Sequence, residues 1–380
     1  MSDFLQPAFY ALMLDGVFSF LVGGAIVLLL LRVTYKNRIF DMPDERKIHD
    51  LPIPRLGGMS FLPTLLLVGV VTIGALYQQN LVGSNFLESK QFTQMAYMLG
   101  GAMVVYFVGI ADDLSDVGFK IKFAAQFIAA SIMAASGLWM RDLFGLYFVH
   151  QFHPAVGIPF SILLMMYITN SINMIDGIDG LASGLSMIAL GCLAFIFMHE
   201  HRFLYSMVSI STLGAVAAFW CFNVFGTREK KRKLFRGDTG SLTLGVILSY
   251  LIICLSFLRP ANGPTRNCKY LIVVFSSLML PMLDVLRLIV YRLKHHKNPF
   301  KADMNHIHHK FLQLGFTQRQ ALFILLGIDV ALIALNALLS MVLEVNVLFV
   351  LDVLIYYVII KVLTVKIIKL ERENKVVFNR

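Results

Sequence analysis

Residues 155–198 read AVGIPFSILLMMYITNSINMIDGIDGLASGLSMIALGCLAFIFM. Two apolar runs, 155–173 and 181–198, flank a short segment that carries Asp176 and Asp179. A helix of roughly 20 apolar residues crosses the hydrocarbon core of a bilayer, and a spanning segment must satisfy its own backbone hydrogen bonds. This stretch therefore predicts two membrane-spanning helices joined by a tight acidic turn.

Similar apolar runs recur along nearly the whole chain. Its 380 residues are 58% hydrophobic and 15% charged, with a mean hydropathy of +0.74, whereas a soluble domain carries about a quarter charged residues. We predict an all-α, polytopic integral membrane protein with a single transmembrane domain, 1–380. The first run is too long for a signal peptide and lacks a basic leader. About eleven spans are expected, or ten if the last two merge: 8–32, 57–78, 93–111, 121–138, 155–173, 181–198, 205–224, 241–258, 270–291, 320–341 and 344–364.

The basic residues set the expected orientation. With the N-terminus outside and the C-terminus in the cytoplasm, 27 of the 33 Lys and Arg residues fall on inner segments, as the positive-inside rule requires. This bias explains the net charge of +10 without nucleic acid as a partner. The four cysteines are scattered, with neither metal-site spacing nor a disulfide framework.

Polar motifs gather on the same inner segments. We expect the loops 33–56, 112–120, 174–180, 225–240 and 292–319 to form one active face, and 365–380 to be a basic tail that lies on the membrane as an amphipathic helix. Charged groups near lipid are costly and occur mostly where they meet an ion, a substrate or each other. The topology therefore predicts one shared site on the cytoplasmic side.

Carboxylates and amides dominate two of these motifs. Asp112, Asp113 and Asp116 share one helical turn, which indicates a metal-linked or general-base site, the alternative being a solvated helix end. Asn170, Asn173, Asp176 and Asp179 recur every three residues. Oxygen ligands of this kind suit Mg²⁺, with Mn²⁺ as the alternative. For Asn170 alone, bonding between neighbouring helices is a reasonable alternative interpretation.

Two further motifs favour phosphate. Gly237-Asp238-Thr239-Gly240-Ser241 precedes an apolar run, so it is either an N-cap or a phosphate seat at a helix N-terminus, with Asp238 holding a bridging cation. Asn305-His306-Ile307-His308-His309 offers imidazoles for zinc, for a polyanion or for an ordinary loop. Zinc is least favoured, because no cysteine or His-Glu-x-x-His pattern accompanies them. Together the motifs indicate phosphoryl transfer that involves a lipid.

The ordered set of motifs resembles the polyprenyl-phosphate N-acetylhexosamine-1-phosphate transferases, in the branch that uses undecaprenyl phosphate and GlcNAc-1-phosphate. The resemblance covers roughly residues 35–325. It rests on five motifs in family order: Arg46-Lys47 with Pro54-x-x-Gly-Gly, Asp112-Asp-x-x-Asp, Asn170-x-x-Asn-x-x-Asp-Gly-x-Asp-Gly, Phe235-x-Gly-Asp-x-Gly-Ser and His306-Ile-His-His.

The resemblance implies a role for each matched residue. Asp112 is the candidate base and Asp113 lies near the metal, while Lys122 and His308 complete the catalytic group. Asn173, Asp176 and Asp238 hold or support Mg²⁺. The residues implied to bind substrate are Lys47, Arg55, Asn170, Asp179, Phe235, His306 and His309, of which Asp179 and Phe235 contact the uracil and the histidines clasp the pyrophosphate and sugar. Relatives usually carry Met where this chain has Arg236, beside the donor site.

The implied reaction converts a UDP-sugar and a polyprenyl phosphate into polyprenyl-pyrophosphoryl-sugar and UMP, with UDP-GlcNAc as the first candidate donor. This would be the first lipid-linked step in the synthesis of a surface glycan. The implied location is a bacterial inner membrane, with the site facing the cytoplasm and a homodimer as the assembly to test. Three alternatives stay open. A phospho-MurNAc-pentapeptide transferase would carry His-His-His-Phe-Glu, a CDP-alcohol phosphatidyltransferase would continue differently after Asp176-Gly177, and a secondary transporter would place its polar site near the midplane.

Overall fold

The computed structural model describes residues 2–37, 54–79, 89–227, 229–258, 265–298 and 305–373. Within these ranges the chain is helical, with no β-strand. The helices are α1 (Ser2–Asn37), η1 (Gly57–Ser60), α2 (Phe61–Gln78), α3 (Lys90–Ser115), α4 (Phe119–Ala135), η3 (Leu146–Phe148), α5 (Pro154–Met174), α6 (Leu181–His199), α7 (Phe203–Phe225), α8 (Gly237–Leu255), α9 (Thr265–Ser277), α10 (Met279–Lys294), α11 (Ile307–Gln313), α12 (Gln318–Leu339) and α13 (Val345–Arg372).

Helices occupy every range that the sequence predicts to cross the membrane, and the all-α, polytopic fold is confirmed. Among the described residues, nine spans are long and apolar enough on their own: α1, α2 with η1, α3, α5, α6, α7, α8, α12 and α13. The pair α9–α10 is bent by 66° and makes a tenth if the two helices together form one broken span. The predicted span 121–138 is α4, whose 17 residues are fewer than the roughly 20 that cross a bilayer straight.

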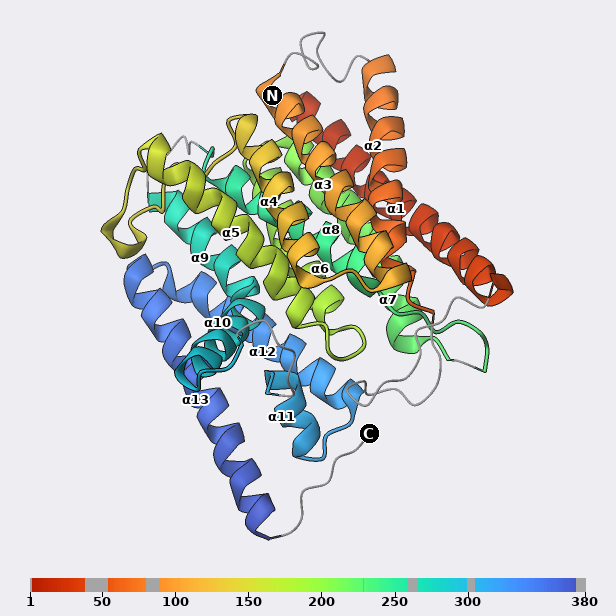
Figure 1. The fold of residues 1–380 in the computed structure, drawn as a ribbon. Coiled ribbons are helices and arrows are strands. Elements are labelled where there is room, and N and C mark those ends of the chain that lie inside the picture. The colour runs from red at the N-terminus through yellow and green to blue at the C-terminus, as the bar shows by residue number, and fades with distance from the viewer. Residues whose placement is uncertain are drawn as a thin grey trace.

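Helix α8 forms the centre of the bundle (Figure 1). Every residue from Thr239 to Leu255 is buried, as expected of a helix that is apolar on all sides. Helices α3 and α5 pack along it, while α1 pairs with α7 and α6 packs on α7. The first turn of α8 therefore lies among the ends of several other helices.

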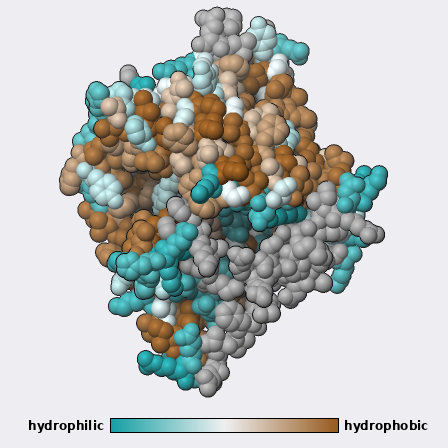
Figure 2. Space-filling view, viewed as in Figure 1, coloured by the Kyte–Doolittle hydropathy of each residue, from teal (hydrophilic) through white to brown (hydrophobic). Residues whose placement is uncertain are grey.

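The helices alternate in direction, so every polar motif within the described residues lies at the same end of the bundle. This end holds the C-termini of α3, α5 and α7, the N-termini of α4, α6 and α8, and the short helix α11. The visible face is largely hydrophobic over α3–α5, and hydrophilic residues gather toward the end with α11 and the last turns of α13 (Figures 1 and 2).

Several loop boundaries differ from those expected. Helix α3 continues to Ser115, so Asp112 and Asp113 lie in its last turn, and α8 already begins at Gly237. Helix α11 lies inside the predicted loop 292–319. The tail predicted over 365–380 does not begin a separate amphipathic helix. Its residues up to Arg372 are the last turns of α13, which continues unbroken from Val345 and projects beyond its neighbours (Figure 1).

Candidate active site

Asp113 caps the first turn of α8. Its fully buried carboxylate accepts hydrogen bonds from the backbone N–H of Asp238 (2.7 Å) and of Thr239 (3.1 Å), and from the Thr239 hydroxyl (2.6 Å). The first N–H groups of a helix have no partner within the helix and carry the positive end of its dipole. The sequence predicted that this helix terminus could bind phosphate. Two of its N–H groups are instead bound by the Asp113 carboxylate of the chain itself.

A glycine in α3 allows this close approach of two helices. A Cβ atom on Gly109 would lie 2.4 Å from the Cα of Thr239, far closer than van der Waals contact permits. The bare backbone lets the last turn of α3 lie directly against the first turn of α8. Because Asp113 follows one turn later, its side chain reaches the N–H groups of α8.

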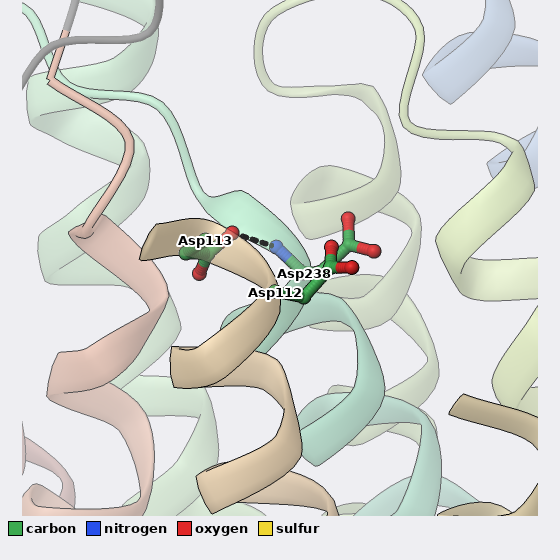
Figure 3. A group of neighbouring side chains, drawn as sticks. All are labelled: Asp112, Asp113 and Asp238. Atoms are coloured by element: carbon green, nitrogen blue, oxygen red, sulfur yellow. Dashed lines mark hydrogen bonds between the residues drawn. The ribbon is translucent and has the colours of Figure 1, made fainter. Parts of the chain in front are cut away.

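Asp112 points in a different direction from its neighbour, toward Asp238 (Figure 3). The Lys122 Nζ atom lies between these two carboxylates, 3.2 Å from Asp112 and 2.7 Å from an oxygen of Asp238. Lys122 comes from the first turn of α4, which follows α3 after a turn of three residues. Two carboxylates that face each other repel, and the ammonium group shows that the position between them suits a cation.

Arg55 reaches the same carboxylates from the segment before α2. Its Nε is 3.5 Å from Asp113 and its Nη2 is 3.5 Å from Asp238. The backbone of this segment pairs with the residues before α8: the N–H of Phe235 donates to the carbonyl of Pro54, and the N–H of Gly57 donates to the carbonyl of Phe235. This pairing fixes Arg55 at the site. Lys47 lies outside the described residues.

The acidic group fits a divalent cation. One oxygen each from Asp112, Asp113 and Asp238 lies within 4.8 Å of the others, and carboxylate oxygens are hard ligands of the kind that Mg²⁺ takes at about 2.0–2.1 Å. Asp238 was predicted as a metal ligand. Asp112 and Asp113 were assigned other roles, and Asp113 already accepts three hydrogen bonds. Asp116, expected on the same turn, is instead the exposed, left-handed C-cap of α3 and stays outside this group.

The other predicted metal ligands lie at the C-terminal end of α5 with partners of their own. Asn173 donates its amide to the Ser241 hydroxyl at 2.7 Å. Asp176 lies 2.9 Å from the Arg236 guanidinium and keeps 28% of its side chain exposed. Burial raises the pKa of the Asp176 carboxyl, while the Arg236 charge opposes that shift. Asn173 and Asp176 thus stay predictions as metal ligands.

Asn170 takes the helix-bonding arrangement that was the alternative for this residue. Its amide and that of Gln126 in α4 exchange hydrogen bonds in both directions, and Asn170 also donates to the carbonyl of Met166. The side chain thereby links α4 to α5. A contact between Asn170 and substrate remains a prediction.

A small polar group links Asp179 to the backbone directly before Phe235, and these are the two residues expected at the uracil. The Lys233 ammonium is 2.5 Å from the Asp179 carboxylate and also donates to the carbonyl of Asn223. The Asn223 amide donates to the carbonyl of Leu234, directly before Phe235. Lys233 and Asn223 were missed because one lies in a basic run and the other inside an apolar helix.

A buried carboxylate holds the histidine segment. Asp284 of α10 lies 2.8 Å from the His306 Nδ1 and accepts hydrogen bonds from the N–H of Ile307 and the hydroxyl of Tyr356. Arg287 pairs with the same carboxylate at 2.8 Å. Asp284 was also missed, although an acidic residue inside an apolar run is a signal in itself.

His308 is pressed against the acidic turn between α5 and α6. It is 1% exposed, and a Cβ on Gly177 would lie 1.9 Å from its Nε2 atom. Burial lowers the pKa of His308 well below 6.5, so the ring is neutral. Its ring centre lies 5.5 Å from that of His306 and 4.3 Å from that of His309. The structure thus joins the histidine motif to the Asp176-Gly177 turn, as a shared site requires.

The fold and these contacts define a membrane protein with acidic and basic groups gathered at one end of a helical bundle. Glycosyl transferase family 4 matches residues 95–256. A probable undecaprenyl-phosphate N-acetylglucosaminyl 1-phosphate transferase of Bacillus subtilis (strain 168) is 30% identical over 324 residues, 82% of each chain. An undecaprenyl-phosphate alpha-N-acetylglucosaminyl 1-phosphate transferase of Yersinia pestis is 26% identical over 84% of this chain and 81% of its own length.

A third relative, a decaprenyl-phosphate N-acetylglucosaminephosphotransferase of Mycobacterium tuberculosis, is 29% identical over 74% of this chain and 71% of its own length. Similarity of this extent covers most of the helical bundle, rather than one isolated motif. The chain belongs to glycosyl transferase family 4, which confirms the predicted family.

Proposed function

We propose that this protein transfers GlcNAc-1-phosphate from UDP-GlcNAc to a polyprenyl phosphate, with undecaprenyl phosphate as the acceptor, and releases UMP. The observation that carries the proposal is the grouping of Asp112, Asp113 and Asp238 with Lys122 and Arg55 at the ends of membrane helices. The names of the three relatives indicate the same donor group and acceptor class.

In this reaction an oxygen of the lipid phosphate attacks the phosphorus that carries the sugar. A new P–O bond forms, the bond to the uridine-bearing phosphate breaks, and UMP leaves with the electron pair. We favour direct attack over an aspartyl-phosphate intermediate, because a lipid phosphate is already an adequate nucleophile. Asp112, about 100° around α3 from the residue that caps α8, is proposed to take the proton of the acceptor phosphate.

Charge neutralisation is the main task of such a site. Lys122 and Arg55 would pair with phosphate oxygens, since each already bridges two carboxylates of the acidic group. Mg²⁺, with Mn²⁺ as a substitute, would supply the remaining positive charge, held by Asp238 with Asn173 and Asp176 in support. His306, His308 and His309 would close over the pyrophosphate and sugar, and Asp179 with Phe235 would hold the uracil.

The test is a transfer assay with purified protein, radiolabelled UDP-GlcNAc, undecaprenyl phosphate and Mg²⁺. Labelled lipid and UMP should form in equal amounts, and excess EDTA or Asp238→Ala should abolish both while the protein stays folded. UDP-GalNAc and UDP-MurNAc-pentapeptide, tested in parallel, separate the donor classes. Uptake of donor into vesicles without labelled lipid would show a transporter, and full activity in EDTA would refute the metal site.

We further propose that the site faces the cytoplasm of a bacterial inner membrane. A cysteine at the exposed Ser115, beside Asp112, should react with an impermeant thiol reagent only after the inner face is opened. A cysteine at the exposed Gln151, at the opposite end of the bundle, should react from outside. Labelling of Ser115→Cys in intact cells would reverse the orientation. Cross-linking of the membrane-embedded protein tests the predicted homodimer.

A further inference from the structure

Arg236 is an arginine enclosed within the bundle at the start of α8. It is 3% exposed, which is unusual for a charged residue. Its Nη2 lies 2.9 Å from the Asp176 carboxylate and donates to the carbonyl of Ile172 at 3.2 Å. Both partners belong to the C-terminal end of α5, where unpaired carbonyls and the negative end of the helix dipole attract a cation.

This contact joins the two helix ends that carry the predicted metal ligands. Asp176 and Asn173 lie at the end of α5, and Asp238 lies two residues beyond Arg236 in α8. A second link runs beside it, because Asn173 donates to the Ser241 hydroxyl at 2.7 Å. The Asp176 carboxylate is repelled by those of Asp179 and Asp238. The Arg236 guanidinium, 2.9 Å from Asp176, supplies a positive charge that offsets this repulsion between the two helix ends.

The rest of the guanidinium faces inward. The Nε and Nη1 atoms are buried and have no hydrogen-bond partner among the described residues. A buried donor without a partner is destabilising, so the ion pair and the helix-end contact must offset that cost. Asp176, in contrast, keeps 28% of its side chain exposed. The carboxylate therefore faces the site and the arginine stands behind it.

We propose that Arg236 is a positioning residue that fixes Asp176 and the last turn of α5 against α8, and so sets the spacing between Asp176, Asn173 and Asp238 for the donor and its cation. The inference rests on the proposed function. It assigns Arg236 no contact with substrate, because the guanidinium is enclosed. Misplacement of a reacting group by about 1 Å costs on the order of a hundredfold in rate, so a residue behind the site can control it.

The test compares Arg236→Met, which removes the charge but keeps the length, with Arg236→Lys, which retains a cation for Asp176. Arg236→Met should lower kcat at least tenfold and raise the Mg²⁺ concentration for half-maximal rate, with the KM for polyprenyl phosphate unchanged. Arg236→Lys should recover most of the rate. The rise in melting temperature that Mg²⁺ and UDP-GlcNAc produce should also be smaller in Arg236→Met. Arg319→Met is the matched control, since Arg319 caps the end of α7 through the Val224 carbonyl.

The outcomes separate positioning from other roles. Loss of a positive charge alone favours cation binding, so a lower Mg²⁺ requirement with unchanged kcat would overturn the proposal. A lower melting temperature with parental kcat and Mg²⁺ dependence would also overturn it, in favour of simple stabilisation. If Arg236→Met does not fold, Arg236→Lys and Arg236→Gln decide by the same measurements. Failure of the parent protein to transfer GlcNAc-1-phosphate would instead refute the proposed function.

Discussion

Substitution of Asp113 by Asn should separate the two aspartates of the Asp-Asp motif by role. The Asp113 carboxylate accepts three hydrogen bonds from the first turn of α8. An asparagine has one acceptor oxygen, and its NH₂ group would face the N–H of Thr239. One buried donor then loses its partner, at about 1–3 kcal/mol, and the remaining bonds lose their ionic strengthening, at about 1–2 kcal/mol more.

We therefore expect Asp113→Asn to destabilise the protein by about 2–5 kcal/mol. An unfolding entropy of about 2.1 cal/mol/K per residue gives about 0.8 kcal/mol/K for this chain, so the melting temperature should fall by about 3–6 °C. The intrinsic fluorescence of the two tryptophans reports unfolding of the detergent-purified protein. Activity should fall together with stability, because the position of Asp238 depends on the same cap.

Two variants control this experiment. Asp112→Asn should change the melting temperature by less than about 1 °C, because Lys122 can still donate to the amide oxygen. Asp116→Asn removes the same charge from an exposed position on the same helix and should be neutral. A double-mutant cycle with Thr239→Val should show coupling to Asp113. If Asp113→Asn abolishes transfer with an unchanged melting temperature, Asp113 contacts substrate or cation directly and the capping role is wrong.

Three further predictions follow from the same contacts. Asp112→Asn should lose rate and regain part of it at higher pH, where the acceptor phosphate is already dianionic; a pH–rate profile of unchanged shape would remove Asp112 as the base. Gly177→Ala should reduce transfer by at least tenfold, because the new methyl group would occupy the place of the His308 ring. The control Gly191→Ala has open space around the new methyl group and should keep the parental activity. Equal activities of the two variants would show that the position of His308 does not affect transfer. Burial holds the pKa of His308 well below 6.5, so below about pH 6.5 the unfolded chain binds a proton that the folded protein does not. The melting temperature should therefore fall as the pH drops below about 6.5. This fall should be smaller in His308→Gln, and an equal pH dependence of the two melting temperatures would contradict the prediction.

The sequence predicted the helices well, because long apolar runs leave a membrane segment few alternatives. All eleven predicted ranges contain helix, and the motifs at their ends lie together. The directions of individual side chains could not be predicted from the sequence. Asp112 and Asp113 are adjacent in sequence, yet successive residues of a helix point about 100° apart. Only the packing of α3 against α8 decides which carboxylate faces the backbone and which faces Lys122.

Contacts between distant segments were equally hidden. Asp284 stands alone in the predicted span 270–291, and its partner His306 follows 22 residues later. Nothing in the periodicity of either segment links them, since Asp284 lies in a predicted span and His306 in the predicted loop 292–319 that follows it. Gln126 and Asn170 likewise pair across 44 residues. The spacing of the Asn and Asp residues predicted a common face on α5, but the neighbouring helix decides that Asn170 is used for packing.

The capped start of α8 changes how phosphate must be bound. A helix N-terminus is a ready anion site, and the sequence alone favoured phosphate there as much as an N-cap. In the structure the Asp113 carboxylate takes the N–H groups of Asp238 and Thr239, so they are not available to a phosphate. The charge of a bound pyrophosphate must then be balanced by side chains, of which Lys122 and Arg55 lie nearest to the acidic group, and by the proposed cation. Both side chains already pair with Asp238, so binding of the donor has to exchange these ion pairs for phosphate contacts. The Asp238 carboxylate is then left for the cation. Binding of the cation and binding of the donor therefore both depend on Asp238.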